Sequence, residues 1–269
     1  MKSKKGYVFA GGVGLLLLFA LMAIHSWLAY GEGVVSSEHK SGADDKYISY
    51  NMESVNGDNY LVIKGTNVIP EFVDSVAPNI SDSDIVLAVA AAFTGERLDY
   101  YKPFNIGGNY VVKGIAKKGF SSKYCTGYFA AFGDGFHIGS NMDEINGKGK
   151  AILYHKQKAI DSKSSYFQQL LLVHNGMITD YIPFTKENQY RALCEKDGEL
   201  LIVQSLDKVT CRDFSEALVV LGVNNALYLD MGSWAWGWFR ENNGSLYELS
   251  YRFPETRYQT NWIVFRKRK

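Results

Sequence analysis

Several residue types are scarce in this 269-residue chain, and each scarcity removes a class of protein. Only 3 cysteines are present and none forms a Cys-x-x-Cys pair, which excludes a redox motif or zinc knuckle of that kind. An odd number leaves at least one thiol unpaired, so either all are buried thiols or two form one bridge. Prolines number 5 against 26 glycines, which favours turns over stiff linkers.

Neither sign of charge is in excess, because 29 Lys and Arg balance 28 Asp and Glu to give a net charge of +1. Such a chain has no overall field that attracts nucleic acid, so none is expected as a partner. The histidines His137, His155 and His174 lack the spacing of a shared metal site, and we expect surface or packing roles for them and no metal. No motif identifies a cofactor, which stays unknown.

One long apolar run is present, at the N-terminus. Lysines at positions 2, 4 and 5 precede residues 6–24, an uncharged stretch long enough to cross a hydrocarbon core of about 30 Å as a helix. The lysines predict that this end stays in the cytoplasm. Residues 1–30 are therefore predicted to be a retained membrane anchor, or a signal segment cleaved near Ala29-Tyr30-Gly31. In both cases the remainder is expected outside the cytoplasm, tethered to the membrane or secreted.

The rest of the chain divides into a polar tether, residues 31–46, and one folded domain, residues 47–269. Strand and turn signals dominate the domain, and they predict an α+β fold with a mixed, largely antiparallel sheet built from hairpins and a few packed helices. Residues 84–93 form a continuous apolar run that indicates a strand buried on both faces, with a helix as the alternative. Hairpin turns are predicted at positions 57–58, 133–135, 175–176 and 196–198.

One helix has clear end signals. Thr210 is a good N-cap with Asp213 three residues later, and Gly222 occupies the position of a left-handed C-terminal residue. A strand over 225–230 is predicted to follow directly, and two late strands, 246–253 and 262–265, close the domain.

The residues most suggestive of chemistry flank this helix. Asp230 ends a predicted strand and is followed by Met-Gly-Ser, a turn that could leave backbone N–H groups pointing at an anion. Arg191 begins a neighbouring predicted strand, from which a guanidinium could grip two phosphate oxygens. The alternative is that Asp230 caps a turn and Arg191 is its structural salt-bridge partner.

The same region resembles a known family. Arg191-Ala, an Asp-Gly turn at 197–198, a Thr-led helix ending in Leu-Gly at 221–222, and Ala-Leu-Tyr-Leu-Asp-Met-Gly-Ser at 226–233 are similar to the C-terminal signature of the phosphodiester glycosidase family. The segment 169–176, Gln-Leu-Leu-Leu-Val-His-Asn-Gly, resembles a further family motif. The resemblance implies hydrolysis of the bond between a sugar's anomeric carbon and a phosphodiester. It also implies that Asp230 and Arg191 are catalytic and that Gly232 and Ser233 line the site.

An upstream segment fits the family less closely. Residues 91–97, Ala-Ala-Phe-Thr-Gly-Glu-Arg, stand where the family has an Asn-Gly-Gly turn after a buried strand. The resemblance therefore implies that Thr94 and Gly95 bind substrate. Glu96 and Asp99 are further candidates for a catalytic carboxylate beside Asp230, with Glu96 preferred.

Two departures from the family pattern keep a second function open. Met231 replaces a glycine after Asp230, and Thr94 replaces the upstream asparagine. The chain is thus expected to be an exported hydrolase that releases a sugar from a sugar-1-phosphodiester of envelope glycan material, or a non-catalytic carbohydrate-binding or scaffold protein on the same fold. Trp234 is a candidate for stacking on the sugar; with Trp236 and Trp238 it could equally form one face of a buried strand.

Overall fold

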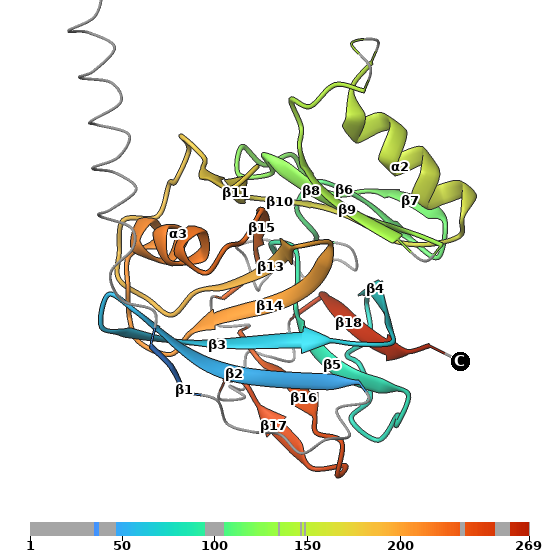
Figure 1. The fold of residues 1–269 in the computed structure, drawn as a ribbon. Helices are drawn as coiled ribbons and strands as arrows, with labels where there is room; N and C mark the ends of the chain where they lie inside the picture. The colour runs from blue at the N-terminus through green and yellow to red at the C-terminus, as the bar shows by residue number, and fades with distance from the viewer. Residues whose placement is uncertain are drawn as a thin grey trace, which may run out of the picture.

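The computed structural model describes residues 35–37, 47–94, 105–133, 135–145, 147, 149–231, 235–250 and 259–268. Their strands form three sheets whose strand pairs run antiparallel, with one isolated parallel bridge between Gly107 and Phe120, and two helices complete the fold (Figure 1). The α+β prediction is confirmed at this level. The predicted membrane or signal segment and most of the tether lie outside the described residues. Among the helices that are described, none combines the length and apolarity needed to span a bilayer.

The first sheet has eight strands. In spatial order they are β1 (Val35–Ser37), β2 (Ile48–Val55), β3 (Asp58–Gly65), β14 (Glu199–Ser205), β13 (Arg191–Lys196), β15 (Asn225–Tyr228), β11 (Leu171–His174) and β12 (Met177–Ile178). The central strand β13 is buried on both faces, because its alternate side chains enter two different apolar clusters. Helix α3 (Cys211–Val220) packs on this sheet beside β11 and β12.

The second and third sheets have five strands each. The second runs in the order β17 (Leu246–Glu248), β16 (Gly237–Arg240), β5 (Ile85–Ala90), β18 (Asn261–Lys267) and β4 (Val68–Asp74). The third runs in the order β7 (Ile115–Lys118), β6 (Asn109–Val112), β10 (Tyr166–Gln169), β8 (Gly127–Phe132) and β9 (Gly135–Ser140). All six residues of β5 are buried, so the strand interpretation of the apolar run is confirmed and the helix alternative is wrong.

The predicted hairpins are confirmed with shifts in their turn residues: Gly135 and Lys196, predicted in turns, are strand residues paired with Phe132 and Glu199. The first turn is Asn56-Gly57 rather than Gly57-Asp58, since positive φ values of 54° and 92° at these two residues give the left-handed pair that a two-residue hairpin requires. The segment that leads into the 175–176 turn divides at Leu170 into two strands. Its first part, β10, belongs to the third sheet, and its second part, β11, crosses into the first sheet.

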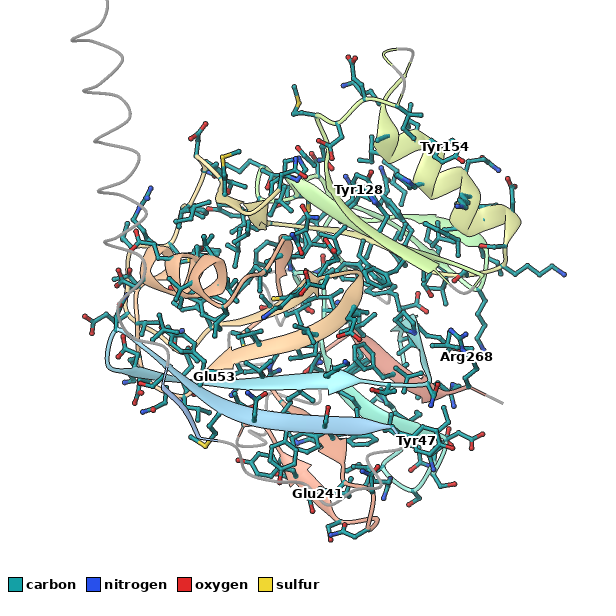
Figure 2. All side chains as sticks on the ribbon, in the orientation of Figure 1. Tyr47, Glu53, Tyr128, Tyr154, Glu241 and Arg268 are labelled. Carbon is teal, nitrogen blue, oxygen red and sulfur yellow. The ribbon has the colours of Figure 1, made fainter. Side chains whose placement is uncertain are left out.

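The two helices differ in how clearly their sequences indicate where they begin and end. The Thr210 hydroxyl accepts a hydrogen bond from the Asp213 backbone N–H at 3.1 Å and Gly222 has φ 79°, so the predicted ends of α3 are confirmed. Helix α2 (Ala151–Asp161) is not predicted, because Lys150 at its N-cap makes no side-chain cap. It covers the third sheet, with Tyr128 on the sheet below it and Tyr154 on its open side, 53% exposed (Figure 2).

One apolar core joins the three sheets. Its largest cluster includes Leu87 of β5, Leu193 of β13 and Phe167 of β10, all fully buried. Phe167 also stacks on Phe72 of β4 with 5.0 Å between ring centroids. Because all three sheets pack around this core, strands that are distant in sequence end close to one another.

The three cysteines lie within this framework as buried free thiols, which confirms that interpretation over a disulfide bridge. Burial raises the pKa of the Cys125 thiol to about 11 and that of Cys211 to about 12, and it raises the pKa of Cys194 further. Since the thiolate is the reactive form, none of them is suited to act as a nucleophile.

Candidate functional site

The chain that leaves β5 passes the point at which the three sheets meet. The carbonyl oxygen of Ala91 accepts a hydrogen bond from the backbone N–H of Asp230, which follows β15 of the first sheet, at 3.0 Å. The same oxygen accepts a second bond from the Gln169 side chain, at the end of β10 of the third sheet, at 3.2 Å. The Ala91 carbonyl, just beyond the end of β5, thus connects the second sheet to strand ends of the first and third sheets.

The next residues of this segment are held just as firmly. The buried Asn261 side chain accepts a hydrogen bond from the Ala92 N–H at 2.7 Å and donates one to the Ala92 carbonyl at 3.0 Å, as a neighbouring strand would. The Thr260 and Thr94 hydroxyls lie 3.2 Å apart. Because both main-chain groups of Ala92 are satisfied by a side chain, the segment can end its strand inside the protein without an unpaired polar group.

The structure brings Asp230 and Thr94 into contact, although they are 136 positions apart in the chain. The Thr94 N–H donates to Oδ2 of the partly exposed Asp230 carboxylate at 3.0 Å. Two residues singled out from separate motifs therefore share one site. The other predicted residues, Gly95, Glu96, Gly232, Ser233 and Trp234, lie outside the described residues, as does Asp99; Gly95 follows Thr94 in the chain and Gly232 follows Met231.

The backbone N–H groups of Asp230 and Met231 are not free to bind an anion, and those of residues 232–234 lie outside the described residues. The Asp230 N–H is bound to Ala91, and the Met231 N–H donates to the Tyr228 hydroxyl at 3.1 Å. The Met231 side chain is only 6% exposed and packs into the apolar cluster that also contains Tyr228. Met231 is thus a core residue here, and its side chain does not extend toward an approaching substrate.

Arg191 is completely buried. Its Nε donates to the Gln204 side chain at 2.8 Å and its Nη1 to the Ala235 carbonyl at 3.0 Å, while Nη2 has no hydrogen-bond partner among the described residues. No ion pair joins it to Asp230 in the described part of the chain, so the salt-bridge alternative is wrong. Burial lowers the pKa of the guanidinium to about 9, which leaves it charged at neutral pH.

The contacts of Arg191 fix both ends of one short segment. Its carbonyl accepts a hydrogen bond from the Leu229 N–H at 2.9 Å, next to Asp230, and its side chain binds Ala235 at the other end. Between these anchor points run Asp230 and the predicted site residues 232–234. The arrangement gives Arg191 the geometry of a positioning residue for this segment.

The tryptophans next to this segment are core residues. Trp236 and Trp238 are 2% and 0% exposed and belong to one apolar cluster with Trp262 of β18. The interpretation as part of a buried strand is confirmed for Trp238 of β16, Trp236 is buried just before that strand, and sugar stacking is wrong for both. Trp234 lies outside the described residues.

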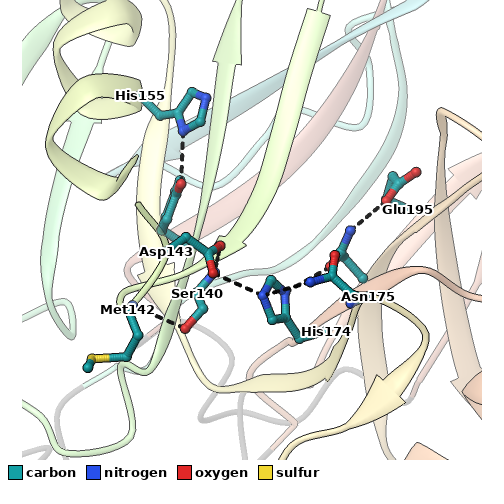
Figure 3. A network of polar contacts seen from close by, with 9 residues as sticks. Ser140, Met142, Asp143, His155, His174, Asn175 and Glu195 are labelled. Carbon is teal, nitrogen blue, oxygen red and sulfur yellow. Dashed lines mark hydrogen bonds and ion pairs between the residues drawn. The ribbon is translucent and has the colours of Figure 1, made fainter. Parts of the chain in front are cut away.

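A network of polar contacts that includes His155 and His174 lies away from this site (Figure 3). The rings of His137 and His155 stack with 4.1 Å between centroids, and Nε2 of His174 lies 3.0 Å from the Asp143 carboxylate. The Tyr128 hydroxyl pairs with Nδ1 of His155 at 2.8 Å. Within the described ranges no group of three or more His, Cys, Asp or Glu side chains is arranged to hold a metal ion.

The histidine stack predicts that the protein loses stability in acid. Burial, then the neighbouring His137 and Lys158, lower the pKa of His155 to about 4, whereas an unfolded chain has about 6.5. The unfolded state therefore binds more protons between these values, and the stability present above about pH 6.5 falls as the pH drops toward 4. After allowance for partial exposure we expect a loss of about 1–2 kcal/mol in urea unfolding. The variant His155→Gln should lose less; an identical pH dependence in this variant contradicts the assignment.

A cavity of about 230 Å³ lies elsewhere, between the turns that join β3 to β4, β8 to β9 and β13 to β14. None of Thr94, Arg191 and Asp230 lines it. The candidate site is therefore defined by its hydrogen bonds at the junction of the sheets.

Comparison with known proteins relates this fold to one enzyme domain. No family model and no curated protein matches the chain. Among solved structures, the catalytic domain of zebrafish N-acetylglucosamine-1-phosphodiester alpha-N-acetylglucosaminidase, auto-inhibited by its pro-peptide, superposes with a TM-score of 0.56 at 12% identity, covering 90% of this chain and 91% of that one. The two folds are distantly related. The zebrafish domain thus supports the architecture that the sequence resemblance implies.

A second solved structure is a hypothetical protein from Synechocystis. It is 12% identical, with a TM-score of 0.48, and covers 88% of this chain and 64% of that one.

Proposed function

We propose that this protein is an exported hydrolase that releases a sugar from a sugar-1-phosphodiester of envelope glycan material. The observation that carries the proposal is the contact between Asp230 and Thr94 where the three sheets meet. The distant relation to the zebrafish glycosidase domain supports it, because the same architecture in that enzyme hosts this class of reaction.

The reaction places a small catalytic requirement on Asp230. A phosphodiester leaves as a weak base, so cleavage needs less general-acid assistance than an ordinary glycosidic bond does. The remaining requirement is a carboxylate that stabilises the oxocarbenium-like transition state or activates water. Asp230 provides a partly exposed carboxylate with one oxygen fixed by the Thr94 N–H. We propose Glu96, two residues after Thr94, as the second carboxylate, and Gly95, Gly232, Ser233 and Trp234 as further substrate contacts.

Arg191 adds a positive field rather than a direct contact. Its partners are an amide oxygen and a carbonyl, and no carboxylate of the described chain neutralises it. A buried charge in a low-dielectric interior acts over longer distances than one in water. It therefore favours a phosphodiester anion near the Asp230 segment, which it also holds in place.

Export is the second part of the proposal. It rests on the lysines and the uncharged residues 6–24 at the N-terminus, which suit a membrane anchor or a signal segment. A fusion of residues 1–46 to a periplasmic reporter enzyme should be active outside the cytoplasm; a reporter that stays in the cytoplasm contradicts export and leaves the enzymatic proposal standing.

The activity is tested with the purified full-length chain and a panel of hexose and N-acetylhexosamine 1-phosphodiesters. We expect steady release of free sugar from at least one member, at a rate proportional to protein concentration. No release from any member contradicts the proposal. Glycan binding without release would favour the second candidate function, a non-catalytic carbohydrate-binding protein. The presence of Thr94 in place of the family's asparagine supports this candidate.

A further inference from the structure

Four aromatic side chains from three separate segments gather beside the candidate site. Phe93 follows β5, Tyr124 precedes β8, and Tyr181 and Phe184 follow β12; we call these four the aromatic cluster. Phe93 lies 5.8 Å from Tyr124 and 6.4 Å from Phe184 between ring centroids, and Tyr124 lies 6.3 Å from Tyr181 with nearly parallel rings. Tyr228 of β15 lies against both Phe93 and Phe184, at 5.6 and 5.4 Å.

The aromatic cluster extends from the neighbouring buried Tyr228 to the surface. Tyr228 is 7% exposed, Phe93, Tyr124 and Phe184 are half-buried, and Tyr181 is 38% exposed. Exposure of aromatic rings to water is unfavourable, and apolar side chains that gather at the surface in this way commonly mark a binding site. The two tyrosines also bring hydroxyl groups, which can bond to polar groups of a ligand.

The cluster and the candidate carboxylate share their supports. Phe93 immediately precedes Thr94, whose N–H binds Asp230. Tyr228 stands two residues before Asp230, and its hydroxyl holds the Met231 N–H. A ligand resting on the cluster therefore lies against the same two chain segments that position the Asp230 carboxylate.

The composition of the cluster fits one ligand class. A pyranose ring has an apolar face of C–H groups that stacks on aromatic rings and a rim of hydroxyls that suits tyrosine. The exposed Lys123 has its Nζ 5.3 Å from the centroid of the Tyr124 ring, so a positive charge stands at the edge of the cluster, where it suits a phosphodiester. We infer that the aromatic cluster binds the sugar ring of the phosphodiester substrate, with Lys123 beside its phosphate. The inference rests on the proposed function, because the substrate is the one assigned there to Asp230.

The test uses the full-length chain with Tyr124→Ala and Tyr181→Ala, and with Tyr154→Ala as the matched control. Tyr154 is 53% exposed on α2, and its ring contact is to His155, outside the cluster (Figure 2). We expect KM for the best sugar-1-phosphodiester to rise about tenfold in both cluster variants, with kcat changed much less, and no change in the control. Tyr181→Phe keeps the ring and should restore most of the affinity, which a merely misfolded variant would not explain.

Equilibrium binding of the same phosphodiester in an Asp230→Asn background separates this inference from the proposed function. A tenfold rise in Kd on adding Tyr181→Ala supports the cluster as the sugar site. An unchanged Kd and KM in both cluster variants, or an equal effect of Tyr154→Ala, overturns it even if Asp230 proves essential. Full turnover by Asp230→Asn would remove only Asp230 from the mechanism. Absence of sugar release by the wild-type chain overturns the proposed function instead, and the binding comparison then still tests the cluster.

Discussion

Replacement of Asp230 by asparagine is expected to lower kcat for sugar release by about a thousandfold. The substitution removes the negative charge that the transition state needs. It keeps an amide oxygen that can still accept the hydrogen bond from the Thr94 N–H. In the wild-type chain this N–H lies 3.0 Å from Oδ2 of the Asp230 carboxylate. KM should change little, because the charge matters chiefly as the oxocarbenium-like state develops.

The matched control for this prediction is Asp161→Asn. Asp161 ends α2, is exposed, and accepts a hydrogen bond from the Gln157 side chain at 2.8 Å. It should leave kcat unchanged, and circular dichroism and thermal unfolding should show both variants folded. Turnover by Asp230→Asn at the wild-type rate would remove Asp230 from the mechanism.

The second large effect is expected from Arg191→Lys, which keeps the charge but not the shape of the side chain. A lysine ammonium cannot reach both Gln204 and the Ala235 carbonyl in the geometry of a guanidinium. The Ala235 carbonyl still accepts a hydrogen bond from the Ser250 hydroxyl, but the buried Gln204 side-chain oxygen loses its donor, which costs about 1–3 kcal/mol. We expect a corresponding fall in the free energy of unfolding in urea, and a loss of kcat of at least about tenfold because the Asp230 segment loses one anchor.

Arg266→Lys serves as the comparison for Arg191→Lys. Arg266 binds Glu71 and Asp82 with 31% of its side chain exposed, so its replacement should cost less than about 1 kcal/mol and leave kcat unchanged. Assays are run at a temperature at which both variants are folded. Equal stability and equal activity of the two variants would show that Arg191 does not position the segment.

The elements that the sequence predicts correctly are those with local signals. The Asn-Gly and Asp-Gly turns carry the conformational preference themselves, and the capping box at Thr210 is complete within four residues. Helix α2 lacks such a cap and is missed. The division of the strands into three sheets is set by contacts between distant segments, such as Phe72 with Phe167, and no local pattern encodes it.

The candidate site shows the same limit. Sequence motifs identify Asp230, Thr94 and Arg191, and the structure places the first two in contact. The burial of Arg191 could have been anticipated, because its strand continues Ala-Leu-Cys, apolar on both faces, and a strand of that kind is central. The aromatic cluster could not, since it is assembled from three segments that are far apart in the sequence, and tertiary packing rather than spacing brings them together.

The most direct test of the account is the position of the bond that breaks. The wild-type chain is given its best sugar-1-phosphodiester in water enriched in heavy oxygen, and the phosphate product is read by phosphorus NMR. Attack at the anomeric carbon, assisted by Asp230, puts the water oxygen on the sugar, so we expect a phosphate monoester with no heavy oxygen. A phosphate that carries heavy oxygen would show cleavage at phosphorus, and would contradict the account.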